Sequence, residues 1–589
     1  MNTFLLLAAI AGTHAIEPVV VTATRTASPA HEVLASVDVI SREELLRQPA
    51  ADLGDLLRMR AGVEVARLGG PGQQTSLFLR GTESNHVLVL VDGVRINPGT
   101  IGSAAIQNIA PELIERVEIV KGPRSALYGS DALGGVINVI TRRGTMNGTS
   151  FQAGAGSYDT RNASFNTGIG GARGDASLGV SWLDSEGFPT RAGDASDRGY
   201  DNLSLTAAAR TGLAGVELGL HAWHASGTSE YSDFFVTPVD QDFENSAFAL
   251  TAGFRPSESW ESRFMLARAL DELEQNQAPD FLRTRRWQLD WQNDIAVAEN
   301  HALTAGLIWQ GEDADAESFG LPYSANTSTR QLYVQDQASF GAQQLLLAAG
   351  YTDHETFGGH LTWNAEIGFA LGDATMLTLA AGAAFRAPDA TDLYGFGGNA
   401  SLDPESSRSY EAGLRHDTAG GQRLSLTLFR NEIDDLIQFV VTDFETFEGE
   451  NRNVERARID GLEAAWRYDG ERWAARASAT LQDPRDAVTD ARLLRRAREN
   501  ITLGAVRRIG RHEVAVDLLY AGDRKDFGFP APVTMPAYWL ANLSARLAVN
   551  ERWTMLARME NLLDEDYELA RGFNTMGRSL FVAVRHQFR

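Results

Sequence analysis

Apolar and polar side chains alternate at nearly every second position along most of the chain after residue 145. The stretch 287–292 reads Trp-Gln-Leu-Asp-Trp-Gln, and 202–209, 424–428 and 539–547 repeat the pattern. Because successive side chains of a β-strand point to opposite faces, this period of two predicts strands with one apolar and one polar face. Many of these stretches carry Trp, Tyr or Phe near an end, where the aromatic girdle of a membrane barrel would lie.

The amount of chain that shows this pattern predicts one large barrel. At roughly 20 residues per strand with its turn or loop, residues 146–589 predict about 22 antiparallel strands. No run approaches the roughly 18 consecutive apolar residues of a membrane-spanning helix, and lipid cannot satisfy an open sheet edge. A soluble β-propeller is the alternative, but it would repeat every ~40–50 residues, and we find no such repeat. The expected fold class is therefore an all-β membrane protein, an outer-membrane β-barrel.

Residues 25–145 have a different character and predict a small α/β domain. Capping-box spacing at 41–44 predicts the start of a helix. His86–Val94, Val117–Val120 and Val136–Ile140 are short apolar runs typical of strands buried on both faces. A barrel of about 22 strands has a lumen too wide for side chains to fill. A folded domain ahead of the barrel is therefore expected to plug it.

The N-terminus predicts export. Phe4–Ala11 is an apolar run followed by small residues, so residues 1–15 are predicted to be a secretory signal cleaved after Ala15. Asn2 and Thr3 lack the positive charge with which such signals usually begin. A mis-started signal or an unusual helix start is the alternative.

The composition excludes several functions. The 77 acidic and 53 basic residues give a net charge of −24, which argues against nucleic acid as a partner. Cysteine is absent, which excludes disulfides, cysteine-based zinc sites and iron–sulfur clusters. No nucleophile elbow, zincin motif or phosphate loop occurs in the sequence. We therefore predict no catalytic residues and no enzymatic activity.

Ordered motifs in both parts of the chain resemble those of TonB-dependent outer-membrane receptors. They are LFLRG at 77–81, VLVDGV at 89–94, RVEIVKGP at 116–123, ALYGSDALGGVINVIT at 126–141, FRAP at 385–388, LDPE at 402–405 and a block at 560–578. The resemblance covers almost the whole chain and implies active import across the outer membrane of a Gram-negative bacterium, with outer-membrane lipid around the barrel. It also implies the periplasmic partner TonB, with ExbB and ExbD, and no required cofactor.

The segment 16–24 resembles the TonB box of this family. Its residues are Glu17, Pro18, Val19, Val20, Val21, Thr22 and Ala23. A Val-rich segment of this kind can add as an extra strand to the edge of a partner's sheet. A buried strand would read the same way, but the position directly after the predicted cleavage site favours TonB binding.

Within the family, the runs 80–97, 122–128 and 567–578 are most similar to receptors for cobalamin. This resemblance implies a corrinoid, cobalamin or a relative of it, as the small-molecule ligand. A ferric siderophore or another scarce nutrient stays open as the alternative.

Two Gly-rich loops of the predicted plug are candidates for the ligand site. The backbone of such loops can approach a flat, amide-fringed ligand closely, and the resemblance places ligand contacts here. The candidate residues are Leu68, Gly69, Gly70, Pro71, Gly72, Gln73, Asn97, Pro98, Gly99, Thr100, Ile101, Gly102 and Ser103. Two ordinary surface turns are the alternative.

Acidic residues gather in two neighbouring barrel loops, where the resemblance implies a structural calcium ion. Asp197, Asp233 and Asp240 are the candidate ligands, because Ca²⁺ prefers carboxylate oxygens. The family's Asp-x-Asp-Gly stretch reads Ser-Asp-Arg-Gly at 196–199, which puts a cation at one ligand position. Hydrated acidic loops without a metal are the alternative.

Overall fold

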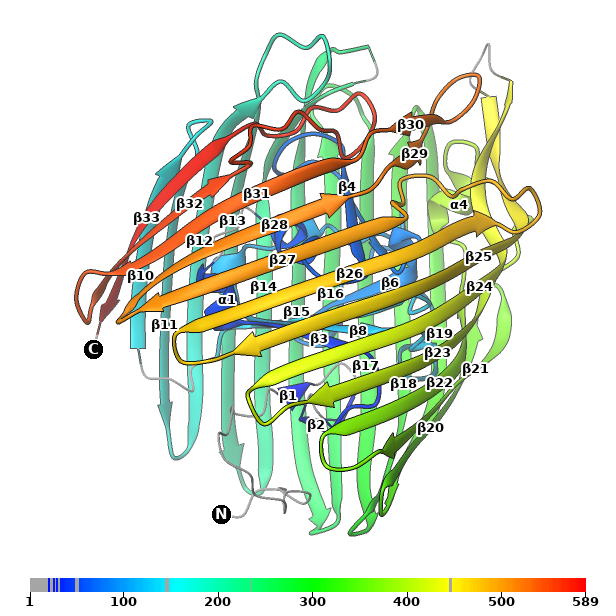
Figure 1. Ribbon diagram of the computed structural model, residues 1–589. Coiled ribbons are helices and arrows are strands. Elements are labelled where there is room, and N and C mark those ends of the chain that lie inside the picture. Colours follow the sequence, from blue (N-terminus) through cyan, green and yellow to red (C-terminus); the bar gives the residue numbers. More distant parts are fainter. Residues whose placement is uncertain are drawn as a thin grey trace.

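The computed structural model shows a closed β-barrel with a smaller folded domain inside it (Figure 1). It describes residues 20–21, 25–26, 28–29, 32–47, 52–143, 148–233, 235–443 and 448–588. The predicted signal 1–15 lies outside the described residues, as do Glu17, Pro18, Val19, Thr22 and Ala23 of the predicted TonB box.

The barrel wall consists of 22 antiparallel strands that follow one another in sequence order. They are β10 (Gly148–Gly156), β11 (Arg161–Gly171), β12 (Gly174–Phe188), β13 (Arg198–Leu213), β14 (Val216–Ser232), β15 (Pro238–Ser257), β16 (Trp260–Gln275), β17 (Phe281–Ala298), β18 (His301–Ser318), β19 (Leu321–Phe340), β20 (Gln343–His354), β21 (Gly358–Ala370), β22 (Thr375–Arg386), β23 (Glu405–Asp417), β24 (Gln422–Asp443), β25 (Glu448–Asp469), β26 (Trp473–Asp486), β27 (Glu499–Ile509), β28 (His512–Ala521), β31 (Tyr538–Ala548), β32 (Trp553–Glu560) and β33 (Ser579–Phe588). β10 pairs with β33 from Thr149↔Phe588 to Gly156↔Phe581. This pairing closes the sheet and removes its free edges, so the predicted fold class is confirmed.

The two faces of the wall are inverted relative to those of a soluble protein. In β17 the side chains of Trp287, Leu289 and Trp291 are 47%, 47% and 37% exposed. The polar side chains of Gln288 and Asp290 between them are 5% and 6% exposed. An apolar exterior around a polar lumen is suited to lipid. No helix in the described part of the chain is long and apolar enough to cross a membrane.

The two ends of the barrel differ. At one end neighbouring strands are joined by short turns such as 214–215, 258–259 and 510–511. The opposite end carries the longer connections, including 387–404, with α4 (Ala390–Tyr394), and 522–537, with β29 (Arg524–Asp526) and β30 (Val533–Met535). In outer-membrane barrels the short turns face the periplasm and the longer loops face outward. We name the two ends accordingly.

The inner domain, hereafter the plug, is built on a five-stranded sheet in the order β3-β8-β9-β6-β7. Its elements are β3 (Val37–Ser41), α1 (Arg42–Arg47), α2 (Leu53–Leu57), β4 (Val63–Arg67), β5 (Thr75–Leu79), η1 (Ser84–His86), β6 (Val87–Val91), β7 (Val94–Arg95), η2 (Ile106–Asn108), η3 (Pro111–Leu113), β8 (Ile114–Lys121), α3 (Ser125–Tyr128) and β9 (Gly135–Thr141). β6 and β9 are parallel, and β4 and β5 form a separate hairpin. The three apolar runs noted in the sequence are β6, β8 and β9, which explains their continuous hydrophobicity: every residue of β6 and β9 is buried.

A pair of short strands, β1 (Val20–Val21) and β2 (Ser28–Pro29), precedes the plug. The predicted capping box begins α1, because the Ser41 amide donates to Glu44 Oε2 at 3.1 Å and the Glu44 amide donates to Ser41 Oγ at 3.4 Å. Of the predicted TonB box, the structure describes Val20 and Val21, which form β1.

Candidate functional site

The first predicted ligand loop, 68–73, connects β4 to β5. It packs against the inner face of the barrel wall near its outward-facing end. Gln73 Nε2 donates to the carbonyl of Glu230 at 2.5 Å and to Ser229 Oγ at 3.2 Å. Gly72 lies so close to the Tyr200 ring that a Cβ at this position would overlap it, and its φ of +74° also favours glycine. Glycine is required here because the loop is wedged against the wall.

The second predicted loop, 97–103, is held by the plug on one side and by α4 on the other. Asn97 accepts from the Val89 amide at 2.7 Å and donates to the carbonyls of Val87 and Gly102. The carbonyls of Gly99 and Thr100 accept from the amides of Ala390 and Thr391 of α4, each at 2.9 Å. α4 therefore covers part of this loop. No local pattern predicts this contact, since it joins backbone groups nearly 300 residues apart.

The polar side chains of Gln73, Asn97 and Thr100 are occupied by internal contacts. Asn97 and Thr100 are fully buried, and Gln73 is 5% exposed. Leu68, Gly99, Ile101 and Ser103 are half-buried, while Gly69, Gly70, Pro71, Gly72, Pro98 and Gly102 are buried. The contacts with Glu230 and with α4 place both loops at the outward-facing end of the plug. The half-buried residues of the two loops offer most of their accessible surface. Their role in ligand binding stays a prediction.

Deeper in the lumen, a buried ion cluster joins the plug to the barrel. Arg80 follows β5, and its Nη1 lies 2.8 Å from Glu411 of β23, while its Nε lies 3.1 Å from Glu463 of β25. Lys121, at the end of β8, donates from Nζ to Glu463 at 3.0 Å. All four side chains are at most 13% exposed. Breaking a buried pair of this kind typically costs about 3–5 kcal/mol, since one charge is left without its partner.

The sequence marked part of this cluster without showing its geometry. Arg80, Lys121 and Glu411 lie within or beside the motifs that resemble the receptor family, but Glu463 carried no signal of its own. One further ion pair, Arg124 with Glu366 of β21 at 2.5 Å, was also missed. Motif position indicates that a residue matters, but its partner depends on how the barrel closes around the plug.

The segment after the predicted TonB box is anchored to the barrel wall by Arg25. Its Nη1 lies 2.5 Å from Asp290 Oδ2 of β17, and its Nε donates to the Leu127 carbonyl of α3 at 2.8 Å. The guanidinium also lies over the rings of Tyr128 and Tyr333, 4.5 and 4.8 Å from their centroids. The Arg25 and Asp290 side chains are 9% and 8% exposed. This anchor holds the leading segment against both plug and wall.

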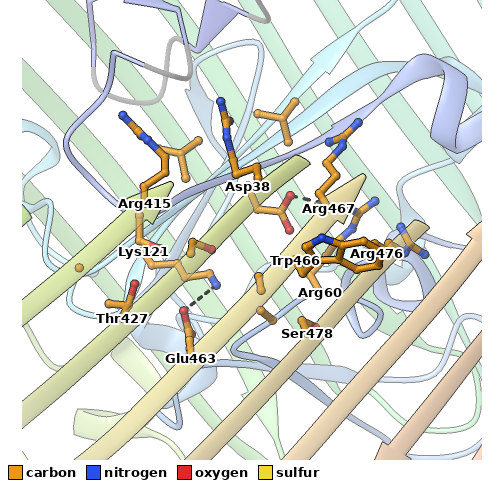
Figure 2. Close-up of a pocket in the computed structure, with 18 of the residues that line it drawn as sticks. Asp38, Arg60, Lys121, Arg415, Thr427, Glu463, Trp466, Arg467, Arg476 and Ser478 are labelled. Atoms are coloured by element: carbon orange, nitrogen blue, oxygen red, sulfur yellow. Dashed lines mark hydrogen bonds and ion pairs between the residues drawn. The ribbon is translucent and has the colours of Figure 1, made fainter. Parts of the chain in front are cut away.

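A cavity of about 780 Å³ separates one side of the plug from the wall formed by β21 to β28. Figure 2 shows charged side chains gathered around it from the plug, including Asp38, Arg60 and Lys121, and from the barrel strands opposite. The turn 418–421 contributes to its lining, so it lies toward the periplasmic end. The ion pair of Lys121 with Glu463 also lines it. The cavity thus extends from the short turns to the buried ion cluster.

The three predicted calcium ligands do not come together. The Asp233 carboxylate accepts from the backbone amides of Phe235 and Thr237 at 2.8 and 2.7 Å, while Asp240 accepts from Asn276 at 2.5 Å. Asp197 is exposed. Among the described residues, no group of three or more His, Cys, Asp or Glu side chains could hold a metal ion. The donor set therefore does not fit the implied calcium site.

The architecture defines a class of protein: an outer-membrane β-barrel whose lumen holds the chain's own N-terminal domain. Family models agree, because the TonB-dependent receptor plug domain matches residues 29–136 and the TonB-dependent receptor-like β-barrel matches residues 140–562. The chain belongs to the TonB-dependent receptor family and is located in the outer membrane.

Among curated proteins, the chain is similar to the "Vitamin B12 transporter BtuB" of Vibrio vulnificus, with 31% identity over 97% of this chain and 95% of that protein. Solved structures share the fold at lower identity. The ferric enterobactin receptor of Pseudomonas aeruginosa has a TM-score of 0.80 at 16% identity and covers 94% of this chain and 98% of its own. The ferripyoverdine receptor of the same species has a TM-score of 0.81 at 16% identity and covers 96% and 88%.

Proposed function

We propose that this receptor imports cobalamin or a related corrinoid across the outer membrane. The observation that carries the proposal is the 31% identity to a vitamin B12 transporter along nearly the full length of both chains. Two siderophore receptors with the same architecture are only 16% and 18% identical, so they support the fold alone and their ligand class enters as an alternative. A ferric siderophore is therefore the second candidate.

The import step needs energy from a partner, because the sequence holds no nucleotide-binding motif. Residues 17–23 supply a β-prone segment that adds to the sheet edge of TonB, which ExbB and ExbD energise. A ligand at the outward-facing loops can signal across the plug only if it binds one plug state more tightly than another. The Arg25 anchor lies two residues beyond the segment 17–23, so it is the contact that has to open when TonB pulls on the segment.

The path for the ligand follows the side of the plug that is already loosely packed. The cavity beside β21 to β28 provides its periplasmic half. The cluster of Arg80, Lys121, Glu411 and Glu463 forms the seal at its inner end, and a pull on the plug opens this seal. A route on this side requires fewer packed contacts to be broken than one through the fully paired plug sheet.

Two measurements test the proposal. Equilibrium binding to the purified, detergent-solubilised receptor is expected for cyanocobalamin and not for ferric enterobactin; the reverse result would establish a siderophore receptor. Deletion of residues 17–23 is expected to abolish uptake by cells while leaving surface binding intact. Uptake that continues without this segment would refute the TonB step. A passive pore, by contrast, would conduct ions both with and without residues 17–23.

A further inference from the structure

One loop at the outward-facing end is tied together by a buried guanidinium. Arg198, the first residue of β13, is 5% exposed. Its Nη2 donates to Asp194 Oδ1 at 2.8 Å, its Nε to Ser232 Oγ at 2.8 Å and its Nη1 to the Asp197 carbonyl at 3.1 Å. Ser232 Oγ donates to the second oxygen of Asp194. One side chain thus joins the loop 189–197, the start of β13 and the end of β14.

The groups that surround Arg198 are the kinds of oxygen donor that Ca²⁺ uses. Calcium is bound by carboxylates, backbone carbonyls and other neutral oxygens. Here a carboxylate, a carbonyl and a hydroxyl converge on N–H donors instead. A divalent ion in the same place would lie next to a fixed positive charge and would be repelled by it. The loop therefore already contains a cation.

The ionised state of the Asp194 carboxyl is consistent with its ion pair with Arg198. Burial works to raise the pKa of its carboxyl, but hydrogen bonds from Ser232 and Ser196, together with the charge of Arg198, lower the pKa below its ordinary value. The carboxylate is accordingly ionised at neutral pH, where its attraction to Arg198 operates.

We propose that Arg198 is a built-in replacement for a divalent cation and that it orders the outer ends of β13 and β14 without calcium. The guanidinium neutralises Asp194 and fixes Ser232 and the Asp197 carbonyl, the two tasks that a bound ion would perform. Asp233 and Asp240, which would be needed to complete a calcium site, make other contacts.

The effect of this cross-link reaches the predicted ligand loops through Tyr200. Tyr200 lies two residues beyond Arg198 in β13 and is 4% exposed. Its ring packs on Gly72, and its hydroxyl lies 3.3 Å from the Gln107 carbonyl and 3.2 Å from Asn108 Oδ1. The start of β13 thus positions a side chain that contacts both the first ligand loop and the segment that follows the second. Order at the mouth of the receptor is independent of calcium supply.

Thermal unfolding of the wild-type receptor in detergent gives the first test. The midpoint is expected to be the same in a chelator and in calcium chloride up to about 10 mM, a range that spans the affinities of extracellular calcium sites. Calorimetric titration of calcium chloride is expected to show no saturable binding. Saturable binding, or a midpoint that rises with calcium but not with magnesium, would overturn the proposal.

The variant Arg198→Asp provides a test by gain of function. It replaces the guanidinium with a second carboxylate beside Asp194, so its unfolding midpoint is expected to rise with calcium, half-maximally at about 10⁻⁴–10⁻³ M. The double variant Arg198→Asp with Asp194→Asn is expected to lose that response.

The proposal can be decided whether or not the Arg198→Asp receptor folds. A folded Arg198→Asp receptor that ignores calcium would show that Arg198 does not stand in a cation position, which overturns the proposal. If that variant does not fold, the wild-type titration is sufficient. The consequence for affinity rests on the proposed function: cyanocobalamin binding should be unchanged by a chelator, and a loss of tenfold or more would overturn the proposal. If cyanocobalamin does not bind at all, the proposed function fails while the calcium titrations still decide this inference.

Discussion

Replacing Arg25 by alanine is expected to release the N-terminal segment from the barrel wall. The substitution removes the pair with Asp290 at 2.5 Å, the hydrogen bond to Leu127 and the contacts with two tyrosine rings. It also leaves Asp290 buried, with 8% of its side chain exposed, and without its cation. The perturbation is thus confined to one side chain that belongs to the segment and not to the plug core.

The size of the effect follows from the burial of the pair. Breaking a buried ion pair costs about 3–5 kcal/mol, and each lost cation–π contact costs roughly 0.5–2 kcal/mol. Because the two charges are almost fully buried, little of this is recovered by solvent. A change of about 3 kcal/mol corresponds to roughly a 10²-fold increase in the population of the released segment, at about 1.4 kcal/mol per factor of ten.

The absence of cysteine makes the assay direct. Ser28→Cys places a single thiol on β2, close to the anchor. Ser28 is half-buried, so a bulky polymer-linked maleimide should react with the thiol faster when the segment is released, and the labelling rate reports the released population. Arg25→Ala is expected to raise this rate by about 10²-fold, as ~3 kcal/mol requires, and Asp290→Asn is expected to act in the same direction.

The control is Arg430→Ala, which removes an ion pair with Asp460 whose side chains are 51% and 37% exposed. Exposed pairs contribute about 0–1 kcal/mol, so the labelling rate should stay near that of the wild type. An unchanged rate in the Arg25→Ala receptor would refute the idea that this side chain holds the leading segment in place.

Three further outcomes are expected. Glu463→Gln should loosen the seal by removing the ion pair of Lys121, so the receptor in a planar bilayer should conduct more current than wild type; equal currents would argue against a seal at this cluster. Burial works to raise the pKa of Glu44, but the charges of nearby arginines outweigh it and hold the pKa at about 2 instead of 4.5. The stabilisation, on the order of 3 kcal/mol, is present above pH 4.5 and is lost as the pH falls toward 2, and an acid titration of unfolding should be flatter in that window for Glu44→Gln. Gly72→Ala should strain the first ligand loop against Tyr200 and weaken ligand binding at least tenfold with the barrel intact; unchanged affinity would show that this loop does not contact ligand.

Much of the fold could be predicted from local patterns. The alternation in 287–292 set which side chains of β17 face lipid, and the apolar runs 87–91 and 135–141 marked strands buried on both faces. Such patterns are sufficient because a strand has only two faces, and water and lipid each accept only one kind of side chain. The number of strands followed from the length of the chain, since each crossing of the membrane needs a similar number of residues.

The candidate site depended far more on tertiary structure. Motifs marked Arg80 and Lys121, but no local pattern connected them to Glu463, 383 and 342 residues away. The acidic loops predicted a metal site, whereas the structure brings Arg198 to Asp194 and sends Asp233 and Asp240 to other partners. The charge of the loops alone could not decide between the two partners, because a carboxylate can pair with a guanidinium group as well as with a metal ion.

By itself, then, the amino-acid sequence determined the class of structure, a plug and a lipid-facing barrel, through short-range regularities that need no knowledge of distant residues. Only the tertiary structure decided which charges meet. Arg25 and Asp290 are 265 positions apart, and they pair because the barrel register and the orientation of the plug bring two buried charges to the same point. That position results from the sum of many individually weak packing contacts, which no single segment encodes.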